Sequence, residues 1–139
     1  MTKRANHSTQ LTETTKHKKP PERAAQTGKN PADAREDDEK LAENAARLGE
    51  IFRQRMRQIQ AQRPETVDLV RGKGLLNAVV IVPAEDGRTA WDVCVTLIER
   101  GVLAKPTHGD IIRFAPPLVI TEQQLHAACD VIAEVILAF

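Results

Sequence analysis

The sequence predicts a two-layer α+β domain, with a mainly antiparallel sheet and helices on one face, preceded by a disordered tail. Three observations support this fold class. The first 36 residues contain hardly any bulky apolar residue. The rest of the chain follows the order helix, two strands, helix, two short strands, helix, as judged from the spacing of its apolar residues. At 139 residues, the chain is also too short for more than one domain.

Residues 1–36 are predicted to be a disordered basic tail. They are rich in Lys, Thr, Pro and Gln and carry eight Lys or Arg against four Asp or Glu, with Leu11 as almost the only large apolar side chain. Two other interpretations are a nucleic-acid arm formed by "KHKKPPER" and an organellar transit peptide. The segment lacks aromatic residues for base stacking and lacks an amphipathic Arg-rich pattern. Binding of nucleic acid is therefore not expected.

The folded part is predicted to span residues 37–139 and to open with a long helix. This helix should begin at Asp37 or Asp38, where acidic side chains favour a helix N-terminus, and should stop before Pro64. Four arginines crowd its far end, and we interpret them as a solvated helix face rather than a phosphate-binding patch. Apolar residues recur at helical spacing: Leu41, Ala45, Leu48, Phe52, Met56 and Ile59.

Two strands should follow within "TVDLVRGKGLLNAVVIVP". Val67, Leu69 and Arg71 alternate with residues of the opposite face, the glycines of "GKG" allow a tight connection, and Pro83 ends the second strand. "GKG" lacks the Gly and Ser/Thr spacing of a phosphate-binding P-loop. The segment is therefore predicted to be a hairpin.

A second helix is predicted from "TAWD", which has the outline of a capping box, to Arg100, with Gly101 as its stop. Trp91 is expected to be a packing anchor of this helix. Its solvent-exposed face is expected to carry Asp92, Thr96, Glu99 and Arg100. Its inward face is expected to carry Trp91, Val95 and Ile98 together with Cys94 and Leu97.

Two short strands, "VLAK" and "DIIRFA", are predicted on either side of the loop "PTHGD". Pro116 and Pro117 end the second of them. A last helix should then open at "TEQQ" in another capping arrangement. Its buried stripe is expected to consist of Leu125, Ala128, Cys129, Ile132, Val135, Ile136 and Phe139.

Arg113 is the strongest candidate for a binding residue. It stands within "IIRF", a predicted strand, where a permanently charged guanidinium needs an anionic partner. A planar guanidinium on a rigid strand suits two-point binding of a carboxylate. The alternative is a structural salt bridge to an Asp or Glu of the same domain, and the residues alone leave both open.

The remaining polar side chains give weaker signals. Lys105 could in principle form an imine with a carbonyl cofactor, but its setting favours an ordinary exposed lysine. His108 has no partner at metal-ligand spacing, so no metal site is predicted. Cys94 and Cys129 lack a CxxC spacing and are expected to be reduced, buried thiols.

Motifs of other classes are missing from the sequence. It contains no Ser/His/Asp set, no paired carboxylates and no glycine-rich dinucleotide fingerprint. No apolar run approaches the roughly 18 residues of a membrane span, and the N-terminus lacks a secretory signal. A soluble, cytoplasmic protein that does not bind membranes is expected.

Four segments resemble a known family. "LAENAARLGE", "VRGKGLLNAVVI", "LAKPTHGDIIRFAPPLVI" and "VIAEVILAF" are similar to the C-terminal small domain of ornithine aminotransferase, a pyridoxal-phosphate enzyme of the class-III aminotransferase group. The similarity runs from about Asp38 to Phe139. The tail matches nothing in that family.

The resemblance implies a small domain that packs beside a larger cofactor domain and closes over the substrate. Such enzymes, which belong to arginine and proline metabolism, transfer the side-chain amino group of ornithine to the cofactor, release glutamate semialdehyde, and then convert 2-oxoglutarate to glutamate. The arginine of the family's "RFAPPL" motif, here Arg113, binds the carboxylate of the acidic co-substrate. A glutamate of the large domain otherwise neutralises it.

The chain also departs from the family. The imine-forming lysine, the aspartate that faces the pyridine nitrogen and the phosphate-binding residues belong to the large domain, and no segment here matches it; Lys105 aligns with a small-domain position. We therefore expect a truncated or split gene product that binds no pyridoxal phosphate and is inactive alone, with a large domain or a related aminotransferase subunit as partner. Two competing hypotheses are a non-catalytic interaction module that keeps the fold and, more weakly, nucleic-acid binding through the tail.

Overall fold

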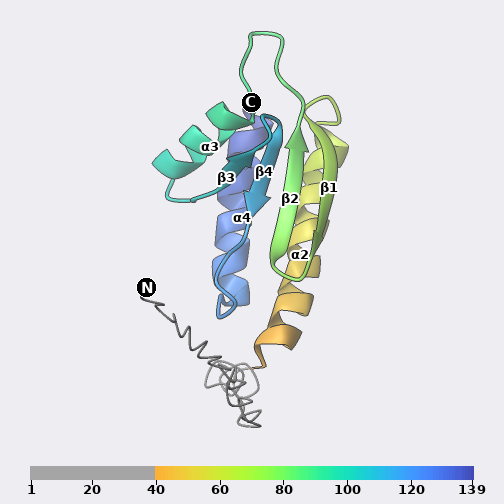
Figure 1. Ribbon diagram of the computed structural model, residues 1–139, viewed down its shortest axis with the longest axis vertical. Helices are drawn as coiled ribbons and strands as arrows, with labels where there is room; N and C mark the ends of the chain where they lie inside the picture. Colours follow the sequence, from red (N-terminus) through yellow and green to blue (C-terminus); the bar gives the residue numbers. More distant parts are fainter. Residues whose placement is uncertain (1–39) are drawn as a thin grey trace, which may run out of the picture.

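A computed structural model describes residues 40–139, which form a four-stranded antiparallel sheet with helices packed against it (Figure 1). The strand order is β1-β2-β4-β3. α2 and α4 pack against each other behind the sheet in Figure 1, and α3 contacts α4 and the β3–β4 side. The elements are α2 (Leu41–Gln62), β1 (Val67–Lys73), β2 (Leu76–Ile81), α3 (Ala90–Glu99), β3 (Lys105–Thr107), β4 (Ile111–Phe114) and α4 (Glu122–Leu137). The predicted fold class and order of elements are confirmed.

Helix α2 ends before Pro64, as predicted, and Lys40 precedes its first residue in a left-handed conformation, with φ of 50°. Its buried stripe contains Leu48, Phe52, Met56 and Ile59. The predicted helix start at Asp37 or Asp38 and the predicted tail, residues 1–36, lie outside the described residues.

The hairpin of β1 and β2 contains an irregularity that the sequence pattern did not show. The register shifts between Val67 and Leu69, which is the signature of a β-bulge. Val67 and Val70 therefore face the core, whereas Leu69 is 44% exposed. The simple alternation of Val67, Leu69 and Arg71 was wrong because the extra residue changes which face the following side chains occupy.

Helix α3 has the predicted capping box: the Thr89 side chain accepts from the helix backbone, and the backbone N–H of Thr89 donates to the Asp92 carboxylate at 2.7 Å. Its inward face was predicted correctly for Cys94 and Leu97 but wrongly for the other three residues. Trp91, Val95 and Ile98 are 62%, 38% and 54% exposed, and the buried residues are Ala90, Val93, Cys94 and Leu97. The two sets lie one residue, or about 100°, apart around the helix. Contacts with α4 and the β3–β4 side decide between them.

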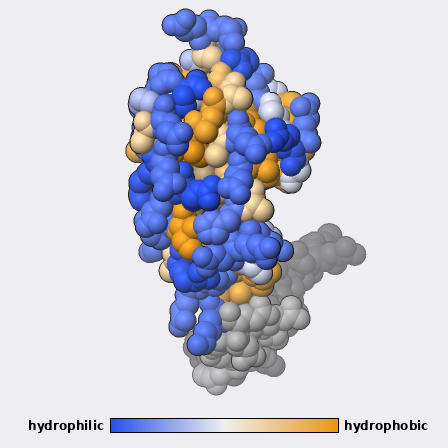
Figure 2. All heavy atoms as spheres, turned by 180° about the vertical axis from the view of Figure 1, so that it is seen from behind, coloured by the Kyte–Doolittle hydropathy of each residue, from blue (hydrophilic) through white to orange (hydrophobic). Residues whose placement is uncertain are grey.

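The core lies between the sheet and the helices α2 and α4. Val79 and Ile112 are fully buried in the central strands, and the rings of Phe52 and Phe114 pack 5.3 Å apart between α2 and β4. α4 carries the predicted capping arrangement of Thr121 and Gln124 and buries Leu125, Cys129, Ile132, Val135 and Ile136. Seen from behind, the helical side is mainly hydrophilic with a narrow apolar strip (Figure 2).

The arginines of α2 differ from the solvated face that was predicted. The Arg53 side chain is only 11% exposed, and it donates to the carbonyl of Gly74 at 3.0 Å and to Asn77 Oδ1 at 2.9 Å. This arginine therefore ties α2 to the turn between β1 and β2. Arg57, which is half exposed and pairs with Glu50, fits the prediction better.

Candidate anion-binding site on the open face of the sheet

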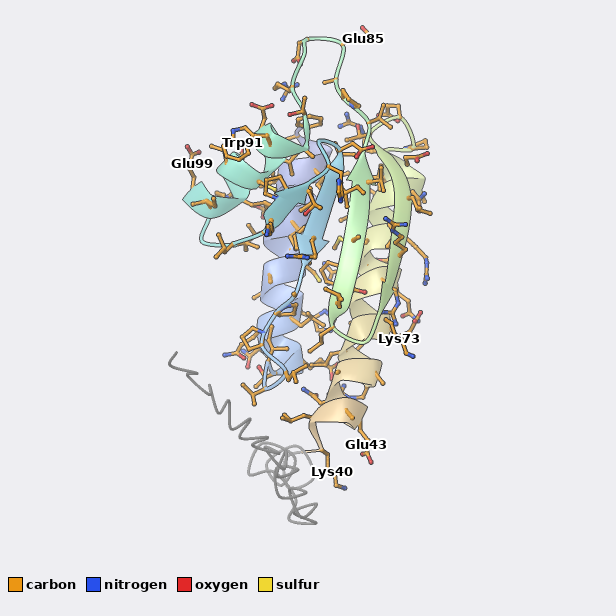
Figure 3. The ribbon with its side chains drawn as sticks, viewed as in Figure 1. Lys40, Glu43, Lys73, Glu85, Trp91 and Glu99 are labelled. Atoms are coloured by element: carbon orange, nitrogen blue, oxygen red, sulfur yellow. The ribbon has the colours of Figure 1, made fainter. Side chains whose placement is uncertain are left out.

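Within residues 40–139, one face of the sheet has no helix on it. We call the face that points away from α2 and α4 the open face; it is the side seen in Figures 1 and 3. Along β2, Asn77, Val79 and Ile81 are buried against the helices, and the residues between them are exposed or partly buried. Strand pairing then assigns to the open face the residues Leu69, Arg71, Lys73, Leu76, Ala78, Val80, Lys105, Thr107, Ile111 and Arg113.

Arg113 lies in β4, one of the two inner strands of the sheet. Its strand neighbours are Ala78 of β2 on one side and Lys105 of β3 on the other. Ala78 in turn pairs with Arg71 of β1. One row across the open face therefore reads Arg71, Ala78, Arg113, Lys105, with three cations and one small residue.

The cations of this row have no acidic partner within residues 40–139. Neither Arg71, Lys105 nor Arg113 forms a salt bridge to a described Asp or Glu. The alternative of a structural salt bridge for Arg113 is thus not realised in the described part of the chain. Its guanidinium is exposed and held on a paired strand, which is the arrangement expected of a group that meets an external anion.

A shallow depression of about 330 Å³ lies beside Arg113 on the open face. Ala78 leaves the space between the two arginines free of a long side chain. No carboxylate among the described residues lines the depression, so their side chains make it a cationic surface over an apolar floor. The lining residues are Arg71, Gly72, Lys73, Leu76, Asn77, Ala78 and Arg113.

This lining does not fit pyridoxal phosphate as an imine-forming cofactor. Such a site needs a lysine that can attack the cofactor aldehyde and an acid to pair with the pyridine nitrogen. Lys73 is exposed at the end of the hairpin (Figure 3), and Lys105 is an exposed residue beside Arg113. We derive no chemical step through the cofactor from these residues.

The other candidates have structural settings. His108 lies in the turn between β3 and β4 with a φ of 54°, followed by Gly109 in the same left-handed region. The described residues contain no cluster of three or more His, Cys, Asp or Glu suited to a metal. Cys94 and Cys129 are free and buried, as predicted, and burial raises the pKa of each thiol to about 11.

Comparison with known proteins identifies the family. Residues 34–136 match the family model described as aminotransferase class-III. The chain belongs to the class-III aminotransferases. It is 52% identical over 101 residues to the mitochondrial ornithine aminotransferase of Drosophila melanogaster, covering 73% of this chain and 22% of the fly protein. It is 58% identical over 96 residues to the ornithine aminotransferase of Schizosaccharomyces pombe, covering 68% and 21%.

Solved aminotransferase structures share the fold. An acetylornithine aminotransferase from Elizabethkingia anophelis superposes with a TM-score of 0.71 at 49% identity, covering 78% of this chain and 28% of that one. An ornithine aminotransferase from Toxoplasma gondii, whose structure has partial occupancy of PLP at its active site, gives 0.70 at 41% identity, covering 77% and 25%. The chain thus spans about a fifth of the length of the curated relatives, and the expected aminotransferase small-domain fold is confirmed.

Sequence reasoning singled out Arg113 but not Arg71, which lines the same depression. The two residues lie 42 positions apart and become neighbours only through β2. A signal was present, because Arg71 stands in a predicted strand just before "GKG". Its face, however, depends on the bulge near Asp68.

None of the helices within residues 40–139 is long and apolar enough to cross a bilayer.

Proposed function

We propose that this chain supplies the small domain of a pyridoxal-phosphate-dependent aminotransferase that acts on ornithine and a 2-oxo acid, and that Arg113 binds the carboxylate of the acidic co-substrate. The observation that carries the proposal is Arg113 itself. It is an exposed guanidinium on an inner strand, with no acidic partner among the described residues, in a chain about half identical to ornithine aminotransferases.

Arg113 would bind and orient the co-substrate. Its fixed fork can donate two parallel hydrogen bonds to one carboxylate, and pairing with β2 and β3 on both sides limits the movement of its backbone. An exposed arginine in water gains little from an ion pair, since solvent screens the charges. The site therefore requires a cover that excludes water, and the open face provides a surface to which such a cover can dock.

The cover would be the large domain of an aminotransferase, or a related subunit, supplied by polypeptide outside residues 40–139. Leu69 and Leu76 are exposed on the open face beside its cations, so a partner with apolar and acidic residues is the expected match. Pyridoxal phosphate, when bound by that partner, supplies the electron sink for transamination. We propose that this chain alone binds no cofactor and is inactive.

The relatives named above are all aminotransferases, so the alternative of a non-catalytic interaction module gains no support from them. We also propose a cytoplasmic location. The two relatives differ in this respect, since the fly protein is named as mitochondrial and the fission yeast protein is not.

Complementation tests the proposed function. The purified chain is mixed with a fragment of the fission yeast enzyme that lacks the matching C-terminal segment, and ornithine-dependent formation of semialdehyde is measured together with each half-reaction. Activity should require both pieces. Arg113→Ala should weaken the 2-oxo acid half-reaction most, while Arg57→Ala, on the helical side, should leave it unchanged.

Two results would contradict the proposal. One is an Arg113→Ala chain that supports the 2-oxo acid half-reaction as well as the original chain does. The other is a stable cofactor absorbance band when pyridoxal phosphate is added to the pure chain, because this would place an imine-forming lysine within the chain itself.

A further inference from the structure

A nearly buried guanidinium joins α2 to the hairpin of β1 and β2. The Arg53 side chain is 11% exposed, and its Nη1 atom donates to the carbonyl of Gly74 at 3.0 Å and to Asn77 Oδ1 at 2.9 Å. Asn77 is the one buried polar residue of the described strands, and its Nδ2 atom donates to the same Gly74 carbonyl at 3.2 Å. Arg53, Asn77 and this carbonyl therefore form one connected hydrogen-bond network between the helix and the sheet.

Asn77 stands next to the residue that pairs with Arg113. In the sheet, Asn77 is the partner of Phe114, and Ala78 is the partner of Arg113. A slip of β2 by one residue would turn Asn77 to the open face and leave Arg53 without its acceptor on this strand. Loss of an acceptor by a nearly buried charge costs more than a shift of apolar contacts, which have no fixed direction. The network thus selects one register of β2 and, through strand pairing, one position for Arg113.

The preceding residue of α2 contacts β4 at the same level. The ring centroids of Phe52 and Phe114 lie 5.3 Å apart, and both residues are buried. Phe114 follows Arg113 directly in the chain and is the strand partner of Asn77. Two consecutive residues of one helix therefore hold two paired residues of β2 and β4. A binding side chain on a strand keeps its geometry only when the residues behind it are fixed.

We propose that Arg53 and Asn77 are positioning residues for Arg113. Their side chains contact each other on the helical side of the sheet, so they act through the strands and not by contact with a substrate. The inference rests on the proposed function, in which Arg113 binds a carboxylate, and adds the group that holds its strand in place. Loss of the network should weaken binding of the 2-oxo acid and leave the ornithine half-reaction unchanged.

Complementation with the fission yeast fragment, at saturating fragment, gives the first test. Arg53→Met should raise KM for the 2-oxo acid about tenfold and change kcat by less than about twofold, because misplacement of a binding group by about 1 Å can cost up to roughly 100-fold. Arg53→Lys keeps a cationic donor and should recover most of the loss. The ornithine half-reaction should be the same for all three chains.

Arg63→Met is the matched control for loss of stability. Arg63 follows α2 and donates to the carbonyl of Leu137 at 2.6 Å and to Thr66 Oγ1 at 3.1 Å, so its removal also weakens the fold. None of its hydrogen bonds reaches β2 or β4. This variant should therefore leave KM for the 2-oxo acid unchanged.

The double variant Arg53→Met/Asn77→Leu separates positioning from stability. Replacement of both polar partners by apolar groups of similar size recovers much of the stability that either single change removes. Apolar contacts do not fix the helix and the strand in one alignment as hydrogen bonds do. The double variant should therefore be close to the original chain in urea unfolding and still show the raised KM.

Amide hydrogen exchange of the full chain gives a second test, which needs no partner. In the original chain and in Arg63→Met, the amides of residues 77–80 and 111–114 should exchange at the free energy of global unfolding measured in urea. In Arg53→Met, the same amides should exchange through a local opening, about tenfold faster than global unfolding predicts.

The outcomes separate this inference from the proposed function. Equal changes in KM for Arg53→Met and Arg63→Met, or uniformly faster exchange across the domain, would show that Arg53 contributes only stability and would overturn the inference. A double variant with the original KM has the same meaning, and it carries the test if Arg53→Met does not fold. If no chain complements the fragment, the proposed function fails, and the exchange result alone decides whether the network fixes the strands.

Discussion

Among the glycines within residues 40–139, Gly49 should be the one at which an added methyl group lowers the stability of the fold most. It lies inside α2, where glycine is about 1 kcal/mol less favourable than alanine, so helix propensity alone predicts that Gly49→Ala stabilises the protein. A Cβ built on Gly49, however, would stand 1.8 Å from the carbonyl oxygen of Gly74, where ordinary contact begins near 3.4 Å. The helix and the hairpin turn must then move apart, because the crowded atoms of Gly74 belong to the backbone and not to a flexible side chain that could turn away.

The expected net loss of stability is about 3 kcal/mol or more. Overpacking typically costs about 1–3 kcal/mol. Separation of α2 from the turn also disrupts the two hydrogen bonds from Arg53 to Gly74 and Asn77, and bonds from a charged donor contribute roughly 1.5–3 kcal/mol each. Gain in helix propensity offsets about 1 kcal/mol of the total. For a domain of this size, such a loss lowers the melting temperature by roughly 10 °C or more.

Urea unfolding followed by circular dichroism measures this loss, with Gln54→Ala on the exposed face of α2 as the control for helix propensity. A double-mutant cycle adds a mechanistic check: Arg53→Met should cost much less in the Gly49→Ala background, because its partners have already moved. A Gly49→Ala chain as stable as the original would refute the close approach of helix and turn.

Exposed carboxylates paired with arginine should make the fold less stable in acid: the hydrogen bond from Arg47 lowers the pKa of Glu122 below its ordinary 4.5, so this contribution is present above that value and is lost as pH falls through the lowered pKa. Urea midpoints from pH 7 to pH 3 should therefore decline, and less so for Glu122→Gln. Cys94 and Cys129, with pKa values raised to about 11 by burial, should resist iodoacetamide at pH 8 until the chain is unfolded. Trp91, the one tryptophan, should be readily quenched by acrylamide in the folded chain; strong protection would restore the buried anchor that the sequence suggested.

Most of the fold could be read from local signals, because each of them acts within a few residues. Pro64 and the capping residues Thr89 and Thr121 marked helix ends correctly, since caps and proline work through the adjacent backbone. The face of α3 could not be read in this way. Trp91, Val95 and Ile98 each follow a residue of the buried set by one position. Contact with α4 and the β3–β4 side buries that set and leaves these three side chains exposed.

Only one of the two arginines of the candidate site could be predicted from the sequence. Arg113 interrupts an apolar strand, and that local contrast is visible in the sequence, whereas Arg71 follows a β-bulge that shifts side chains between the two faces. No spacing rule pairs residues 71 and 113, because their proximity comes from two separate strand pairings with β2. Non-local register is a property of the folded sheet and not of either segment.

The distribution of charge explains why the site should lie on the open face and not among the more numerous arginines of the helices. On the helical side, each arginine has an acid or a carbonyl within reach, and its charge contributes to holding elements together, as Arg53 does between α2 and the hairpin. Cations left without acids repel one another and weaken the fold slightly, so they add nothing to the stability of the domain by itself. A row of such residues, fixed on paired strands around Ala78, is suited to binding an anion that the domain does not contain. The two faces of the sheet therefore differ in role: the buried face determines the fold, and the open face is available for binding an anion.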